Sequence, residues 1–161
     1  SASKLMENIA GEYNGSIQWS KTSHNKIVSL LLNSGEAGIR QYEMQYDAIS
    51  GLINILNFLS VNQISLAYMV ESIPEFYRRE NEVECNWEKK GSIIREIIQS
   101  NTGKQMETLE GVMVKEENGN VLILPDEEKP VFKIISESFS EEFAQELIDY
   151  YSTKIEDINR L

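Results

Sequence analysis

The residues most suited to chemistry in this sequence are three adjacent carboxylates, Asp126, Glu127 and Glu128, which stand between two predicted strands. Carboxylate oxygens are the ligands that magnesium and calcium prefer, so a divalent metal site is one interpretation. A run of like charges is more often a solvated turn, and we favour that interpretation. The chain has one histidine, His24, and one cysteine, Cys85, which excludes an internal disulfide and any site that needs two of either residue.

A second set of carboxylates, Glu80, Glu82 and Glu84, alternates along a predicted strand, so the three side chains project from one face. Paired carboxylates can carry out acid–base catalysis, but no partner group is evident in the sequence. We therefore predict a solvated edge strand that its charges protect from pairing with other chains. Cys85 follows this strand without an obvious basic neighbour, so we predict a packed side chain and not a nucleophile.

The 161-residue chain has the composition of a soluble globular protein, with 41% apolar and 25% charged residues. Its formal net charge of −11 argues against nucleic acid or an anionic membrane as a partner, since both need a positive surface. Residues 1–79 carry 6 basic and 7 acidic residues, and residues 80–161 carry 9 and 19. Because no apolar segment matches a membrane helix or a signal peptide, we expect a cytoplasmic protein.

This shift in charge predicts two domains, residues 1–74 and 75–161, divided where Pro74 discourages a helix. In the first domain we expect an α/β arrangement of helices around a small mixed sheet. Strands are expected at residues 16–20 and 39–44. Apolar residues recur at helical spacing elsewhere, and Asp47 and Ser65 are expected to cap two of the helices. The expected helices are residues 3–13, 23–32, 47–59 and 65–73.

In the second domain we expect an α+β arrangement, an antiparallel four-stranded sheet with two helices on one face. Asn118-Gly119 is a strong signal for a tight hairpin turn. One helix is expected to begin at Asn86, and the other, capped by Ser140, carries an apolar stripe to Ile158. The expected strands are residues 76–84, 111–116, 121–124 and 131–136.

Four segments of this domain carry a family resemblance: Val83–Gly91, Glu110–Val114, Leu122–Pro125 and Pro130–Ile134. In their residue types and in their order along the chain, these segments resemble the C-terminal fourth domain of the phosphohexomutase superfamily, which comprises the phosphoglucomutases and phosphomannomutases. The first domain resembles the end of that family's third domain, through Ile9–Gly15 and through the helical segments after Asp47 and Ser65. The resemblance implies a truncated third domain followed by a complete fourth domain.

The resemblance places the family's sugar-binding loop at residues 33–38, where Gly35 and Glu36 match it. A residue is missing before Gly38, and the family's histidine is replaced. The polar residues there suit hydrogen bonding to sugar hydroxyls, so the candidate substrate-binding set is Gly35, Glu36, Gly38 and Arg40. We favour a glycine turn leading into a strand over a retained sugar site.

The resemblance also places a substrate-phosphate loop at the acidic segment. Active members carry Arg-Pro-Ser-Gly-Thr-Glu-Pro there, and its arginine, hydroxyls and glycine suit a phosphate. Here leucine replaces the arginine and three carboxylates replace serine, glycine and threonine, so we expect phosphate binding to be lost. The degenerate positions are Leu124, Asp126, Glu127, Glu128 and Lys129, with Lys133 as a nearby cation.

We therefore expect the phosphomannomutase-like C-terminal region of a mannose-1-phosphate guanylyltransferase or similar fusion protein, not catalytic by itself. Two alternatives stay open: a fragment of an active phosphohexomutase that closes over a hexose phosphate, and an acidic protein-interaction module. The family's phosphoserine and magnesium loop lie in other domains, so we expect no catalytic residue, metal or cofactor here and magnesium only in the parent enzyme. Expected partners are upstream domains of the same protein; a hexose phosphate and a second copy are further candidates.

Overall fold

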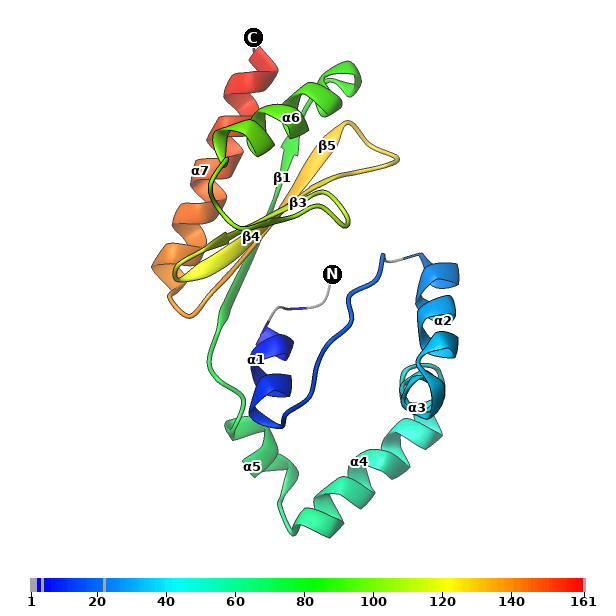
Figure 1. The fold of residues 1–161 in the computed structure, drawn as a ribbon. Helices are drawn as coiled ribbons and strands as arrows, with labels where there is room; N and C mark the ends of the chain where they lie inside the picture. The colour runs from blue at the N-terminus through cyan, green and yellow to red at the C-terminus, as the bar shows by residue number, and fades with distance from the viewer. Residues whose placement is uncertain (1–2, 4, 22, 161) are drawn as a thin grey trace. The chain divides into compact units, whose positions relative to one another are not determined.

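The computed structural model describes residues 3, 5–21 and 23–160 (Figure 1). The described chain forms two compact units: the first comprises residues from Met6 to Pro74, and the second comprises the residues from Glu75 onward together with Ser3 and Leu5. The first unit is helical. Its helices are α1 (Leu5–Glu12), α2 (His24–Asn33), α3 (Gly35–Tyr46), α4 (Ala48–Asn62) and α5 (Leu66–Glu71).

Both strands predicted for the first unit are wrong. Residues 39–44 belong to α3, and residues 16–20 have no regular structure. The described part of this unit contains no strand that could pair with either segment. Because an unpaired strand leaves its backbone groups unsatisfied, the arginine, glutamine, glutamate and methionine of residues 39–44 follow their helix propensity instead.

Two of the predicted helix caps are confirmed. Asp47 Oδ1 accepts hydrogen bonds from the backbone nitrogens of Ile49 at 2.9 Å and Ser50 at 3.2 Å, at the start of α4. Ser65 Oγ accepts from the nitrogen of Tyr68 at 3.0 Å, at the start of α5. Each cap satisfies amide groups that have no partner within the helix.

The second unit contains one antiparallel sheet of five strands, not the four predicted, in the order β1-β5-β4-β3-β2. The additional strand, β2, has two residues and pairs with β3, which makes it too short to show an alternating pattern. The predicted edge position of the first strand is confirmed, because β1 pairs only with β5. The strands are β1 (Tyr77–Glu84), β2 (Met106–Glu107), β3 (Val112–Glu116), β4 (Gly119–Pro125) and β5 (Val131–Ser138).

Two helices cover one face of this sheet, α6 (Lys90–Ser100), preceded by the 3₁₀ turn η1 (Trp87–Lys89), and α7 (Glu141–Arg160) (Figure 1). Buried apolar side chains from both helices and four of the strands form a single cluster. A polar contact lies within it: Tyr151 Oη donates to Asn101 Oδ1 at 2.9 Å. The fully buried members are Ile93, Ile97, Val112, Val114, Val121, Ile123, Phe132, Ile134, Tyr151 and Ile155.

No helix among the described residues combines the length and the apolar character needed to cross a membrane.

Candidate functional site

The acidic segment forms a closed turn between β4 and β5. Asp126 Oδ1 accepts hydrogen bonds from the backbone nitrogens of Glu128 at 2.8 Å and Lys129 at 2.7 Å. These two hydrogen bonds hold the pKa of the Asp126 carboxyl below its ordinary value, and the bond from Glu128 has the larger effect. The Asp126 nitrogen donates to the carbonyl of Val131 at 3.1 Å. We call residues 126–130 the acidic loop. The backbone amides of Glu128 and Lys129 are therefore already hydrogen-bonded to a carboxylate of the loop itself, that of Asp126.

Lys90, the first residue of α6, holds the same loop from the other side. Its Nζ donates to the backbone carbonyls of Asp126 and Lys129, each at 2.5 Å. The ammonium also lies 3.8 Å from the centre of the Trp87 ring. Sequence reasoning missed these contacts of Lys90. The spacing of three residues between Trp87 and Lys90 at a helix start could have indicated the ring contact, but not the bonds to the loop.

The other two acidic residues of the loop, Glu127 and Glu128, are exposed, as a solvated turn requires. Among the described residues, no three histidine, cysteine, aspartate or glutamate side chains are arranged to hold a metal ion. The loop therefore presents negative charge to solvent, while its inward groups are bonded to one another and to Lys90.

Leu124 and Lys133 are opposite each other on β4 and β5, before and after the loop. Lys133 Nζ lies 2.8 Å from Glu80 Oε2, and Arg78 Nη2 lies 2.7 Å from Glu80 Oε1. Both contacts lower the pKa of the Glu80 carboxyl, and the contact with Lys133 has the larger effect. Arg78 also contacts Glu137 at 3.4 Å. Lys133 is thus part of an ion network across β1 and β5.

The candidate sugar-binding residues lie in the first unit, whereas the acidic loop belongs to the second. Gly35, Glu36, Gly38 and Arg40 lie in the first two turns of α3, so the predicted turn into a strand is wrong. Gly35 begins the helix with φ +62°, a backbone conformation that favours glycine. A Cβ on Gly38 would lie 1.8 Å from the carbonyl oxygen of Leu31, so this glycine permits close contact with α2.

Cys85 is buried, and burial raises the pKa of its thiol, while Lys90 lowers it to a smaller extent. A protonated, buried thiol is a poor nucleophile, which agrees with the predicted packing role.

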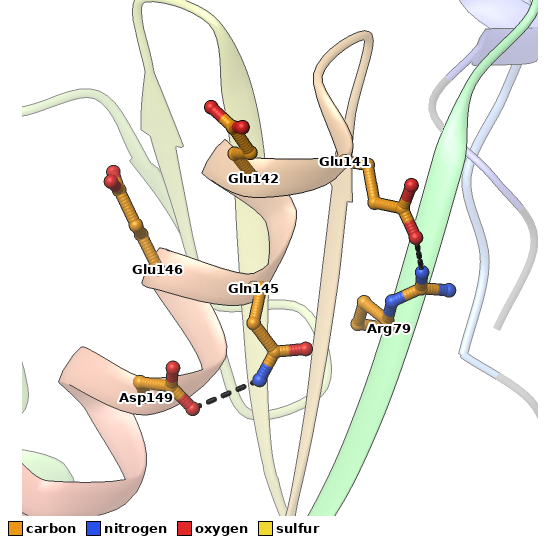
Figure 2. Close-up of a pocket in the computed structure, with 6 residues that line it drawn as sticks. All are labelled: Arg79, Glu141, Glu142, Gln145, Glu146 and Asp149. Atoms are coloured by element: carbon orange, nitrogen blue, oxygen red, sulfur yellow. Dashed lines mark hydrogen bonds and ion pairs between the residues drawn. The ribbon is translucent and has the colours of Figure 1, made fainter.

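A shallow recess along α7 is lined mainly by acidic groups (Figure 2). Arg79 of β1 forms an ion pair with Glu141, and Gln145 Nε2 donates to Asp149 Oδ1 at 2.9 Å. Four carboxylates face one arginine here, so the recess repels anions such as phosphate. We call it the α7 acidic surface; its residues are Arg79, Glu141, Glu142, Gln145, Glu146 and Asp149.

Comparison with known proteins gives a structural match. No family model matches the sequence, and no significant match was found among curated proteins. Among solved structures, a phosphoglucomutase/phosphomannomutase family protein of Burkholderia thailandensis is similar to this chain, with a TM-score of 0.71 and 16% sequence identity. The match covers 96% of this chain and 35% of the other, so the chain spans about a third of that protein. The fold is therefore like that of a phosphoglucomutase/phosphomannomutase family member.

Proposed function

We propose that this chain is the phosphomannomutase-like C-terminal region of a larger carbohydrate enzyme, of the kind that joins a sugar-phosphate nucleotidyltransferase to a mutase-like body. The chain itself has a structural role and does not hold the substrate phosphate. The fold likeness and the one-third coverage of the similar structure agree with a mutase-like region of a larger enzyme, and the nucleotidyltransferase part of the proposal rests on the sequence resemblance alone. The bonding of the acidic loop supports the second statement, that the chain does not hold the substrate phosphate.

The observation that carries the proposal is that the loop's inward groups are already paired. Backbone amides bind phosphate by donating to its oxygens, and here two of them donate to Asp126. Lys90, whose ammonium contacts the loop backbone, is bound to two carbonyls. A phosphate dianion would have to displace the Asp126 carboxylate and approach Glu127 and Glu128, whose charges repel it.

The test is isothermal titration of mannose 1-phosphate, mannose 6-phosphate and glucose 6-phosphate into three proteins. The unchanged chain is expected to show no saturable binding. A restored-loop variant, which regains the arginine, hydroxyls and glycine of the family pattern, is expected to bind at least one of them. Its substitutions are Leu124→Arg, Asp126→Ser, Glu127→Gly and Glu128→Thr.

A matched control makes the same change in net charge on the α7 acidic surface and is expected not to bind. Micromolar binding by the unchanged chain, centred on residues 124–130, would contradict the proposal, and so would equal binding by the restored-loop variant and the control. The control substitutions are Glu141→Gln, Glu142→Gln, Glu146→Gln and Asp149→Asn.

One observation favours a second candidate, a fragment of an active phosphohexomutase: the similar structure is itself a phosphoglucomutase/phosphomannomutase family protein. In that case Glu36, Arg40, Lys129 and Lys133 are the polar residues to examine. The full reading frame distinguishes the two. A nucleotidyltransferase domain upstream supports the first candidate, whereas a phosphoserine loop followed by a three-aspartate loop supports the second.

A further inference from the structure

The first unit contains a segment without charge whose apolar side chains face solvent. Residues 48–70, which comprise α4, the turn after it and most of α5, include no aspartate, glutamate, lysine or arginine. We call these residues the uncharged segment. Its exposed large apolar side chains are those of Ile49, Leu52, Ile53, Ile55, Leu56, Phe58, Val61, Leu66, Tyr68 and Val70.

The first unit also lacks a core of its own. Among the described residues from 6 to 74, the only buried ones are Gly38 and Gly51. Gly51 lies where α4 meets α3, since a Cβ there would be 3.2 Å from the carbonyl oxygen of Met44. The buried apolar side chains of the described chain all lie in the second unit. Because burying apolar area is the main favourable term in folding, the uncharged segment needs another surface to cover it.

The exposed apolar side chains of α4 are not confined to one side of the helix. Ile49 and Phe58 are nine residues apart, so at about 100° per residue they project from opposite sides. Their side chains are 72% and 47% exposed. A surface helix instead has one apolar stripe with charged residues opposite it. The polar residues of α4 are uncharged, and two of them bond back to the helix. Asn54 Nδ2 donates to the carbonyl of Ser50 at 2.9 Å, and Asn62 Nδ2 donates to that of Phe58 at 2.8 Å. This composition is typical of a helix enclosed on more than one side.

Neither a bilayer nor a second copy of the chain provides this enclosure. No helix among the described residues can span a membrane. A helix that lies on a membrane surface needs a polar face rich in lysine and arginine, and α4 has neither residue. A two-fold interface between copies covers one side of α4 and leaves the opposite side in water. The enclosing surface must also be apolar, because a charge buried against the uncharged segment would have no partner there.

We propose that α4 is a core helix of a domain that the first unit forms only in part, and that the rest of the same polypeptide encloses residues 48–70. This inference rests on the proposed function, in which the chain is one region of a larger enzyme. The match to the similar structure includes 96% of this chain but 35% of the other, so a polypeptide of that architecture has ample chain beyond the matched region. One continuous polypeptide can surround a helix from several sides, and its contacts avoid the entropic cost of association.

Thiol labelling tests this by comparing the 161-residue chain with the polypeptide of the full reading frame. Cys85, the one cysteine of this chain, is buried, so an introduced cysteine supplies the accessible thiol. Ile49→Cys and Phe58→Cys place it on opposite sides of α4. Both are expected to react at least about tenfold more slowly in the full polypeptide, because reaction there requires local opening. The matched control is Phe139→Cys in the second unit, at a side chain 58% exposed, and it is expected to react equally fast in both proteins.

Hydrogen exchange of the two unchanged proteins provides a measurement that depends on no variant. Amides of residues 48–70 are expected to exchange more slowly in the full polypeptide, at concentrations where light scattering shows a single copy. Protection that disappears on dilution would assign the surface to a second copy and overturn the proposal, and so would equal slowing at Phe139→Cys. If the full polypeptide is longer but residues 48–70 label and exchange as in the 161-residue chain, the inference fails and the proposed function stands. A reading frame that adds no polypeptide would refute the proposed function itself.

Discussion

Substitution of Lys90 by methionine isolates the contribution of one ammonium group to the acidic loop. Methionine keeps most of the aliphatic length of lysine, so packing beside Trp87 is largely retained. The change removes two hydrogen bonds from a charged donor to the carbonyls of Asp126 and Lys129, together with the cation–ring contact. A hydrogen bond from a charged group contributes roughly 1.5–3 kcal/mol, and a partly exposed cation–ring contact about 0.5–1 kcal/mol.

These contributions are not additive here. Lys90 is only half-buried, and water can replace it at both carbonyls, so we expect a loss of about 1–2 kcal/mol in the free energy of unfolding. In a unit of fewer than a hundred residues, each kcal/mol lowers Tm by roughly 4–8 °C. Urea and thermal unfolding, followed by circular dichroism, measure both quantities.

The matched control is Lys129→Met, which removes the same charge from an exposed side chain of the same loop. It is expected to change the unfolding free energy by less than about 0.5 kcal/mol. If Lys90→Met is as stable as the unchanged chain, or if the two variants lose the same amount, the loop does not depend on the Lys90 contacts and the reasoning fails.

Three further predictions concern the second unit. Gly111→Ala should destabilise it by about 2 kcal/mol or more in urea, because Gly111 has φ +71° and a Cβ would lie 2.2 Å from the carbonyl oxygen of Ile123. Tyr151→Phe should cost about 1–2 kcal/mol by the same assay, since it leaves buried Asn101 Oδ1 without its donor. Burial raises the pKa of Tyr151 above the ordinary 10.0, so its contribution should be complete below pH 10 and fall as pH rises further, a loss that Tyr151→Phe should not show. The amide signals of Glu128 and Lys129 in NMR spectra should shift with pH, and Asp126→Ala should abolish that shift. Because the pKa of the Asp126 carboxyl is lowered from its ordinary 3.8, its stabilising hydrogen bonds are fully present above pH 3.8 and are lost as the pH falls through the lowered pKa.

The parts of the fold that the sequence predicts well are those determined by residues close together in the chain. A tight turn joins β3 to β4 as expected, but its two residues are Glu117 and Asn118, since Gly119 already pairs with Glu116 as the first residue of β4. The apolar stripe after Ser140 forms α7. The caps at Asp47 and Ser65 depend on amides two or three residues away. Such features require no knowledge of the rest of the structure.

The features that sequence reasoning missed depend on partners distant in the chain. A strand at 39–44 would need a second strand beside it, and the described first unit contains none. The two residues of β2 are held by pairing with β3. Lys90 contacts carbonyls 36 and 39 residues further along the chain, so its local sequence does not indicate that it holds a loop.

The bonding of the acidic loop also explains how such a loop can keep a defined shape under the proposed function. Backbone amides that converge on one point need a negative partner, and in a phosphate site the ligand supplies it. Here Asp126 supplies the negative charge to the amides of Glu128 and Lys129, and Lys90 supplies the positive charge to the carbonyls on the other side. The loop is thereby ordered without a ligand. Replacing the family's serine by Asp126 would then remove phosphate binding at little cost in the free energy of unfolding. The Asp126 carboxylate accepts hydrogen bonds from the backbone amides that would otherwise lose their phosphate partner.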